Sequence, residues 1–183
     1  MDLTGKIIVS VPSLEDERFF KTVIYMCAHS SEGSMGIIIN KKIDYDLYPD
    51  LLEQLGIDKP LENKKLYIRY GGPVESGRGF VLHSDDLIRK ETLNINKGVA
   101  LTSTAEFFDD LSVGKGPKNS ILALGYAGWG AGQLEIEIIQ NNWMTLSVNN
   151  SFLFDEEVSG KWSEAYKIMG VNPNNLSFKS GNA

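Results

Sequence analysis

The chain has 183 residues, of which 42% are hydrophobic and 23% charged, and its formal net charge at pH 7 is −6. This length suits one domain with a hydrophobic core and is short for two independent domains. Because the balance is acidic, we do not expect direct DNA binding or attachment to an anionic membrane.

Compartment and redox state are indicated by what the sequence lacks. Residues 1–17 have no basic leader, long apolar core or cleavage site typical of a secretory signal. The longest apolar run, residues 23–28, is too short to span a bilayer. The single cysteine, Cys27, cannot form an internal disulfide and provides no cysteine pair for zinc. We therefore predict a cytoplasmic protein without a cofactor or a bound metal.

The first elements along the chain are predicted strands. β-Branched and aromatic runs occupy residues 6–10, 22–29 and 34–40. The polar segment SSEG between the last two runs predicts a hairpin. Neither hairpin strand alternates cleanly between apolar and polar residues, which indicates a sheet covered on both faces by helices.

A helix is predicted over residues 48–56, where three leucines share one side and Gly56 is placed as a C-cap. Strands near residues 65–70 and 79–83 follow. They flank the glycine-rich segment YGGPVESGRGFVLHSDD, and we interpret them as a second antiparallel hairpin.

In the second half, a helix is predicted after an N-cap at Thr102 or Ser103, with Glu106 as its capping-box partner. The later elements are a strand over 120–125, a glycine-rich loop, a helix over 132–142, a strand over 143–148 and a helix over 160–170. The last helix has one apolar face, formed by Trp162, Ala165, Tyr166 and Met169. Because these elements show no regular β-α-β alternation, we predict an α+β fold, with one domain over residues 1–175 and a frayed polar tail over 176–183.

The segment from residue 72 to residue 79 resembles a phosphate-binding loop. Such a loop needs a lysine, a hydroxyl and a following helix, whereas this chain has Arg78, Gly79 and then a strand. Nucleotide hydrolysis is therefore disfavoured. A turn in which Pro73 fixes φ and Gly71 or Gly72 takes a positive φ accounts for the glycines. It leaves Arg78 and His83 as candidates to line a cleft.

A second glycine cluster, GYAGWGAGQLEIE, follows a strand and precedes a helix. It differs from a dinucleotide-binding fingerprint because Gln133 replaces the third glycine. Glu135 and Glu137 at the start of the helix would repel a phosphate. Two interpretations stay open: the loop packs Trp129 and Tyr126, or its amides bind an uncharged or weakly anionic ligand.

Cys27 and His29 are two residues apart on a predicted strand, so their side chains are expected on the same face. At about 7 Å between Cβ atoms they would lie parallel rather than hydrogen-bonded, which disfavours a thiolate–imidazole nucleophile. His83 could complete a metal site only if its strand lies beside theirs. A buried core cysteine is the simpler interpretation.

Six segments, taken in order from about Leu3 to the tail, resemble the YqgE/AlgH family of bacterial proteins: VPSLEDERFFKTVIYMCAH, EGSMGIIINK, YGGPVESGRGFVLH, LTSTAEFFDDLSVGKGP, ILALGYAGWGAGQLEIEIIQNNW and FLFDEEVSGKW. The resemblance implies a single α+β domain whose bifurcated mixed sheet includes a small closed barrel and is surrounded by helices. It marks motif positions without assigning them a role; these are Cys27, His29, Gly36, Asn40, Gly71, Gly72, Pro73, Arg78, Gly79, His83, Gly125, Gly128, Trp129 and Gln133. Ala131 departs from the pattern, since proline is frequent there.

The family is commonly labelled as transcriptional regulators, after a member linked to alginate synthesis. Because the candidate helices are acidic and no catalytic motif is complete, we expect a non-enzymatic regulatory or interaction protein that acts through an unidentified protein partner, with an indirect effect on transcription. The alternative is a small-molecule-binding protein or weak enzyme whose cleft lies between GGPVESGRGFVLH and GYAGWGAGQ, with Arg78 as anion contact and His83 as a polar or acid–base group. The candidate site residues are Arg78, His83, Gly71, Gly72, Gly128 and Trp129, followed by the thiol and polar candidates Cys27, His29 and Asn40.

Overall fold

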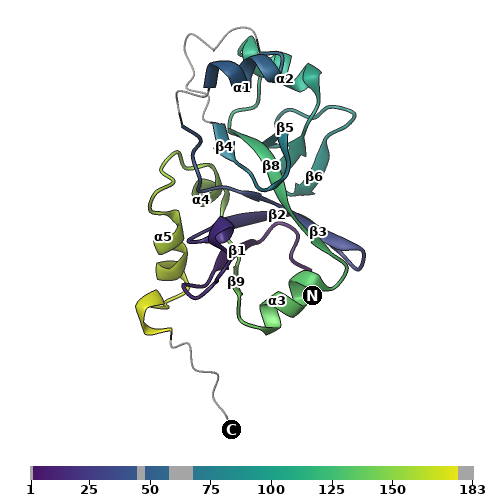
Figure 1. Ribbon diagram of the computed structural model, residues 1–183. Coiled ribbons are helices and arrows are strands. Elements are labelled where there is room, and N and C mark those ends of the chain that lie inside the picture. The colour runs from purple at the N-terminus through teal and green to yellow at the C-terminus, as the bar shows by residue number, and fades with distance from the viewer. Residues whose placement is uncertain (1, 45–47, 58–67, 177–183) are drawn as a thin grey trace.

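The structure is a computed structural model that describes residues 2–44, 48–57 and 68–176 (Figure 1). Strands and helices are mixed along the chain, which confirms the α+β class. The strands are β1 (Ile7–Ser10), β2 (Val23–Ser30), β3 (Gly33–Ile38), β4 (Ile68–Tyr70), β5 (Val74–His83), β6 (Leu93–Asn96), β7 (Val99–Thr102), β8 (Ser120–Gly130) and β9 (Trp143–Leu146). The helices are α1 (Tyr48–Gln54), α2 (Ala105–Ser112), α3 (Gln133–Ile139), α4 (Asn150–Phe154) and α5 (Lys161–Ile168), with short 3-10 turns at Glu17–Phe19 and Pro173–Asn175.

The described strands form one sheet in the order β6-β7-β5-β8-β3-β2-β1-β9, with β4 also paired to β8. All of these pairs are antiparallel except β4 with β8. The first half of β8 pairs with β4 and β5, and its second half pairs with β3. The sheet therefore divides on β8. Among the described strands the pairings run from β6 to β9 without joining these two, so the small closed barrel is not shown.

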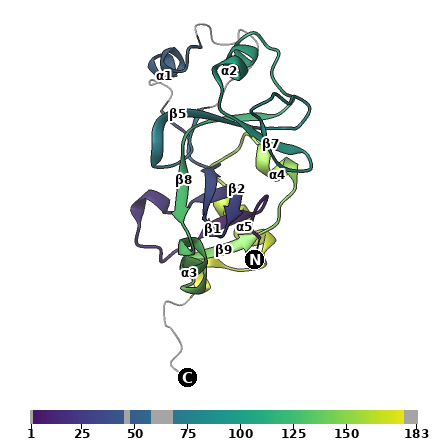
Figure 2. The same ribbon diagram turned by 90° about the vertical axis from the view of Figure 1, so that its right-hand side faces the viewer.

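Helices cover both faces of the hairpin half of the sheet, as its apolar strands predict. One face packs in a cluster with Trp162, Ala165 and Tyr166 of α5, and the other packs with Leu134 of α3. A third cluster places α1 and α2 against β5 and the first half of β8. Figures 1 and 2 show β8 running from the part of the molecule that carries α1 and α2 to the part that carries α3.

The two predicted hairpins have different outcomes. β2 and β3 form the hairpin predicted from SSEG. β4 and β5 do not pair with each other, because residues 122–124 of β8 lie between them and pair with both. The second predicted hairpin is therefore wrong, and the chain between β4 and β5 instead crosses β8. The positive φ predicted for Gly71 or Gly72 is found at Gly72, with φ 152°.

This crossing explains three of the motif glycines. A Cβ atom on Gly71 or Gly72 would collide with the backbone of Gly125 or Tyr126, and a Cβ on Gly125 would collide with the carbonyl oxygen of Gly72. Gly71 also accepts a 2.9 Å hydrogen bond from the amide of Ile38 and donates one of 2.8 Å to the carbonyl of Leu124. The glycines are thus required where two backbone segments touch.

Several boundaries in the second half differ from the prediction. Most of the loop predicted between the strand over 120–125 and the helix over 132–142 is strand, because β8 continues to Gly130 and its residues 127–130 pair with β3. The N-cap of α2 is Thr104 and its side chain makes no capping bond, so the capping box at Thr102 or Ser103 is wrong. Thr102 lies inside β7 instead. The segments that form β6, β7 and α4 were not predicted, whereas α5 buries the face predicted for it. Of the predicted tail, residues 177–183 lie outside the described residues.

Candidate functional site

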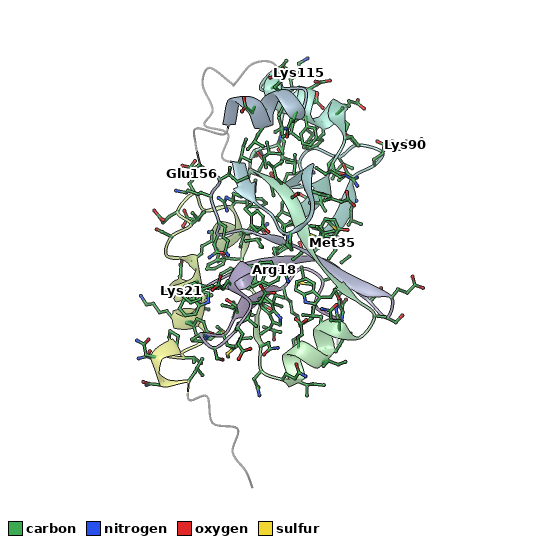
Figure 3. The ribbon with its side chains drawn as sticks, in the orientation of Figure 1. Arg18, Lys21, Met35, Lys90, Lys115 and Glu156 are labelled. Atoms are coloured by element: carbon green, nitrogen blue, oxygen red, sulfur yellow. The ribbon has the colours of Figure 1, made fainter. Side chains whose placement is uncertain are left out.

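An open groove of about 480 Å³ lies beside the arm formed by β2 and β3. Figure 3 labels Met35 on this arm, where β3 leaves the body of the molecule. The groove is bounded by the hairpin, by β8 and by the first residue of β5. The described residues that line it are Ala28, Ser30, Glu32, Gly33, Ser34, Met35, Val74, Tyr126, Gly128 and Trp129.

Strand register determines which side chains face the groove. Met35 pairs with Ala28 on one side and with Gly128 on the other, and Tyr126 pairs with Val74. Directly paired residues share a face of a sheet, and so do residues two apart on a strand, so these five positions form one surface. The groove floor is therefore apolar, with the exposed hairpin tip and its Glu32 carboxylate at one end.

Tyr126 forms one wall of the groove. Its ring packs edge-on against Phe80, with centroids 5.6 Å apart and planes at 76°. A Cβ atom on Gly128 would come within 3.2 Å of the Tyr126 ring. The absence of a side chain at Gly128 therefore leaves room for the Tyr126 ring and keeps the adjoining surface of the sheet open. The sequence did not reveal this role of the glycine.

Trp129 contributes to the groove from the opposite side of β8, because its indole packs in the cluster with Leu134 of α3. Its Nε1–H donates to Glu137 at 3.0 Å, and the Nε1–H of Trp143 donates to the same carboxylate oxygen at 2.7 Å. Gln133 donates to the other oxygen of Glu137 at 2.9 Å and accepts from the amide of Gly130 at 3.0 Å. The GWGAGQLEIE motif is thus a hydrogen-bonded junction of β8, α3 and β9.

Arg78 lies outside the groove. It is exposed, donates to Glu75 at 3.0 Å and to Ser103 Oγ at 2.9 Å, and stacks over Phe80 at 5.1 Å. These contacts stabilise the irregular first half of β5, where the pairing register with β8 shifts between Val74 and Gly79. The guanidinium is therefore engaged in the chain's own structure.

His83 is fully buried, with 0% of its surface exposed. Its Nδ1 lies 2.9 Å from the carbonyl oxygen of Ser84, which can only accept, so Nδ1 carries the proton. Its Nε2 then accepts from Thr102 Oγ1 at 2.9 Å, and that hydroxyl accepts from Thr92 at 2.8 Å. Burial lowers the pKa of His83, which keeps the ring neutral. The prediction that Arg78 and His83 line one cleft is therefore wrong. His83 is enclosed in the core, and Arg78 is bound to Glu75 and Ser103 outside the groove.

Cys27 and His29 lie on opposite faces of β2, contrary to the expectation from their spacing. The register of β2 on β3 shifts between Met26 and Ala28, so Cys27 occupies a β-bulge. Its thiol is buried in the cluster that includes Tyr25, donates to the Tyr25 carbonyl at 3.7 Å and has its pKa raised to about 12 by burial. It is therefore a core thiol.

His29 faces α3. Its Nε2 lies 3.5 Å from Glu135 Oε1, and its Nδ1 lies 2.9 Å from Ser34 Oγ. For the neutral ring, a carboxylate that only accepts places the proton on Nε2, so Nδ1 accepts from the serine. This is a serine–histidine–carboxylate series, but the alternation of β3 directs the Ser34 side chain away from the face of Met35. Ser34 itself lines the groove, whereas its described lining includes neither His29 nor Glu135.

Asn40 joins β3 to the start of β2. Its Oδ1 accepts from the amide of Val23 at 2.8 Å, and its Nδ2 donates to the carbonyl of Lys21 at 2.9 Å. Lys21 has a φ of 47°, a conformation that costs free energy in a non-glycine residue. Asn40 thus stabilises a strained backbone position through both its oxygen and its nitrogen.

Two buried cations were not singled out from the sequence. Lys161, at the start of α5, is 1% exposed and donates to the carbonyl of Phe152 at 2.5 Å. Burial, followed by the charge of Arg69, lowers the pKa of Lys161. Arg69 donates to the carbonyls of Ile39 and Asp155. These side chains tie β4 to the α4–α5 connection.

The part of the chain that the structure describes contains neither a cluster of metal ligands nor a membrane-spanning helix. Within it, three or more histidine, cysteine or acidic side chains nowhere gather as a metal site would require. Within the same residues, no helix has the length and apolarity needed to cross a membrane.

The AlgH-like family model matches residues 7–174. The chain belongs to the AlgH-like family. It is 44% identical over 184 residues to a UPF0301 protein of Jannaschia sp., covering 100% of this chain and 96% of that protein. It is 42% identical over 181 residues to a UPF0301 protein of Rhodospirillum rubrum, covering 99% and 94%.

Solved structures agree with this assignment. The solution structure of the AlgH protein from Pseudomonas aeruginosa is 35% identical in sequence, has a TM-score of 0.81 and is covered to 97%, with 100% of this chain matched. A crystal structure of a protein from Corynebacterium diphtheriae is 19% identical, with a TM-score of 0.69 over 92% of this chain and 87% of that one. The second likeness concerns the fold alone.

Proposed function

We propose that this AlgH-like chain is a cytoplasmic, non-enzymatic interaction protein that binds a partner protein at the hairpin groove. In this proposal a regulatory effect on transcription passes through the bound partner rather than through DNA. The observation that carries the proposal is the apolar, open surface formed by Ala28, Met35, Val74 and Tyr126 on an arm of the sheet.

The shape of the groove favours a protein partner. Small-molecule sites enclose most of the ligand surface, whereas protein interfaces use open surfaces with an apolar centre and a polar rim. Here apolar side chains form the floor, and Ser30 and Glu32 lie at the rim of an open groove. Val74 is 36% exposed, so part of this floor can be buried by a partner.

The internal contacts of the candidate chemical groups also favour binding over catalysis. Cys27 and His83 are buried in the core, and His29 is held between Ser34 and Glu135 on the other face of the arm. A nucleophile or general base must reach a substrate. The groove surface presents none of these three groups.

A small-molecule ligand is the second candidate, because the groove volume of about 480 Å³ falls within the range of small-ligand sites. The two candidates predict different results for purified protein. A metabolite that raises the unfolding temperature of the wild type and not of Met35→Glu would support the second.

The test of the first candidate is affinity capture from bacterial extract with three matched baits: the wild type, Met35→Glu in the groove, and Ile168→Glu on α5. Ile168 is 52% exposed, and α5 contributes no residue to the described groove lining, so its variant controls for added charge. We expect a protein retained by the wild type and by Ile168→Glu but lost with Met35→Glu. Equal retention by all three baits would contradict the proposal.

A further inference from the structure

The groove has chemical features that restrict what it can bind. Resting on the proposed function, we propose that its occupant is an extended segment of a partner protein with a large apolar side chain and, two residues along, a lysine or arginine. The apolar side chain packs on Met35 and Tyr126, and the cation pairs with Glu32.

The apolar part of the groove lies between Met35 and Tyr126. Met35 provides an unbranched, polarizable side chain that adapts to different apolar partners, and Tyr126 provides a rigid ring braced by Phe80. Gly128, between them on the sheet, carries no side chain and is exposed. A leucine, methionine or phenylalanine side chain can therefore lie on the sheet between a flexible and a rigid wall.

The charge at the end of the groove comes from Glu32. Glu32 is exposed at the tip of the hairpin, where its own amide donates to Ser30 Oγ at 3.2 Å and fixes the turn. It is the charged residue among the described lining residues, and the ion pairs of the described chain do not include it. Arg78, the cation of the neighbouring β5 segment, is paired with Glu75. With a net charge of −6 on the whole chain, the groove end is complementary to a cation.

The spacing between Glu32 and Met35 restricts the sequence pattern of the bound segment. Glu32 lies in the hairpin turn and Met35 is three residues further along the chain in β3, so the chain between them spans at most about 10 Å. In an extended partner, residues i and i+2 point to the same face and are about 7 Å apart. The long side chain of lysine or arginine spans the remaining distance. An apolar-x-basic pattern therefore fits the groove better than adjacent residues, which would point to opposite faces.

The experiment selects heptapeptides from a random displayed library on the full chain, with counter-selection on Met35→Glu. Val74→Glu is a second groove variant, which keeps the test valid if Met35→Glu does not fold. We expect the selected peptides to carry the apolar-x-basic pattern. The affinity of a selected peptide, followed by fluorescence anisotropy, should fall at least tenfold with Glu32→Lys and stay within twofold with Glu164→Lys, an exposed acid of α5.

The outcomes separate the two proposals. Peptides that depend on Met35 or Val74 but lack the basic residue, or that bind Glu32→Lys as tightly as the wild type, would overturn the inference and leave the proposed interaction function standing. A library that yields no peptide dependent on either groove residue would contradict both.

Discussion

Gly72 lies directly against the backbone of Tyr126, with no space between them for a side chain. This contact fixes the segment that crosses β8 between β4 and β5. The backbone of Tyr126 contacts the crossing segment, and its side chain forms the groove wall. The glycine-rich segment that resembles a phosphate loop is therefore the support of the groove.

Replacement of Gly72 by alanine should destabilise the protein by about 3 kcal/mol or more, since a Cβ would collide with backbone and φ is unfavourable for alanine. Gly77→Ala is the matched control, because a Cβ there has nothing within 4 Å. Urea unfolding of the two variants measures the difference. Equal stabilities would show that the crossing tolerates a side chain.

Glu137 accepts hydrogen bonds from the indoles of Trp129 and Trp143. Glu137→Ala leaves two part-buried N–H donors without this partner, so we expect a loss of about 2–4 kcal/mol in the free energy of unfolding. A change in tryptophan fluorescence should accompany it. Glu164→Ala, in an exposed position of α5, should change neither quantity. A Glu137→Ala protein as stable as that control would show that these hydrogen bonds do not stabilise the fold.

His83 should make stability depend on pH. Its pKa is lowered in the folded state by burial, so below the unfolded value of about 6.5 the unfolded chain binds a proton that the folded chain does not. Its contribution is therefore full above pH of about 6.5 and is lost as pH falls toward the folded pKa. His83→Gln should flatten the stability profile in this window, measured by urea unfolding at several pH values. An unchanged profile would contradict the assignment.

Cys27 should be unreactive in the folded protein. With its pKa raised to about 12, roughly one thiol in ten thousand is ionised at pH 8, and the sulfur is buried. Alkylation by iodoacetamide should therefore be slow in buffer and rapid in denaturant, as followed by mass spectrometry. Rapid modification of the folded protein would show that the bulge on β2 opens.

Local patterns predicted the elements whose partners are near in the sequence. The turn SSEG gave the β2–β3 hairpin, and helical spacing gave the buried face of α5. The pairing of β4 and β5 with β8 depends on residues 37 to 54 positions away, so local patterns assigned these two strands to each other. The family resemblance marked the motif glycines without showing that they meet at a backbone crossing.

The candidate site was predicted only in part for a similar reason. Tyr126 and Gly128 lay in a segment already singled out, but Met35 and Ala28 join them only through the register of β3 on β8 and β2. A one-residue bulge at Cys27 separated it from His29, and sequence spacing carries no sign of such a bulge. Arg78 and His83 were predicted to contact a ligand because the sequence does not show their partners. The tertiary fold brings Ser103 to Arg78 and Thr102 to His83.

We propose that the hairpin groove contacts a partner protein in the cell. A photoreactive amino acid placed at Val74 tests it directly, with the same residue at Ile168 as the control, since both positions are exposed and only the first lines the groove. We predict a discrete protein adduct from position 74 that disappears when Met35→Glu is added and that position 168 does not give. Identical adducts from the two positions, or an adduct at 74 that persists with Met35→Glu, would contradict the account.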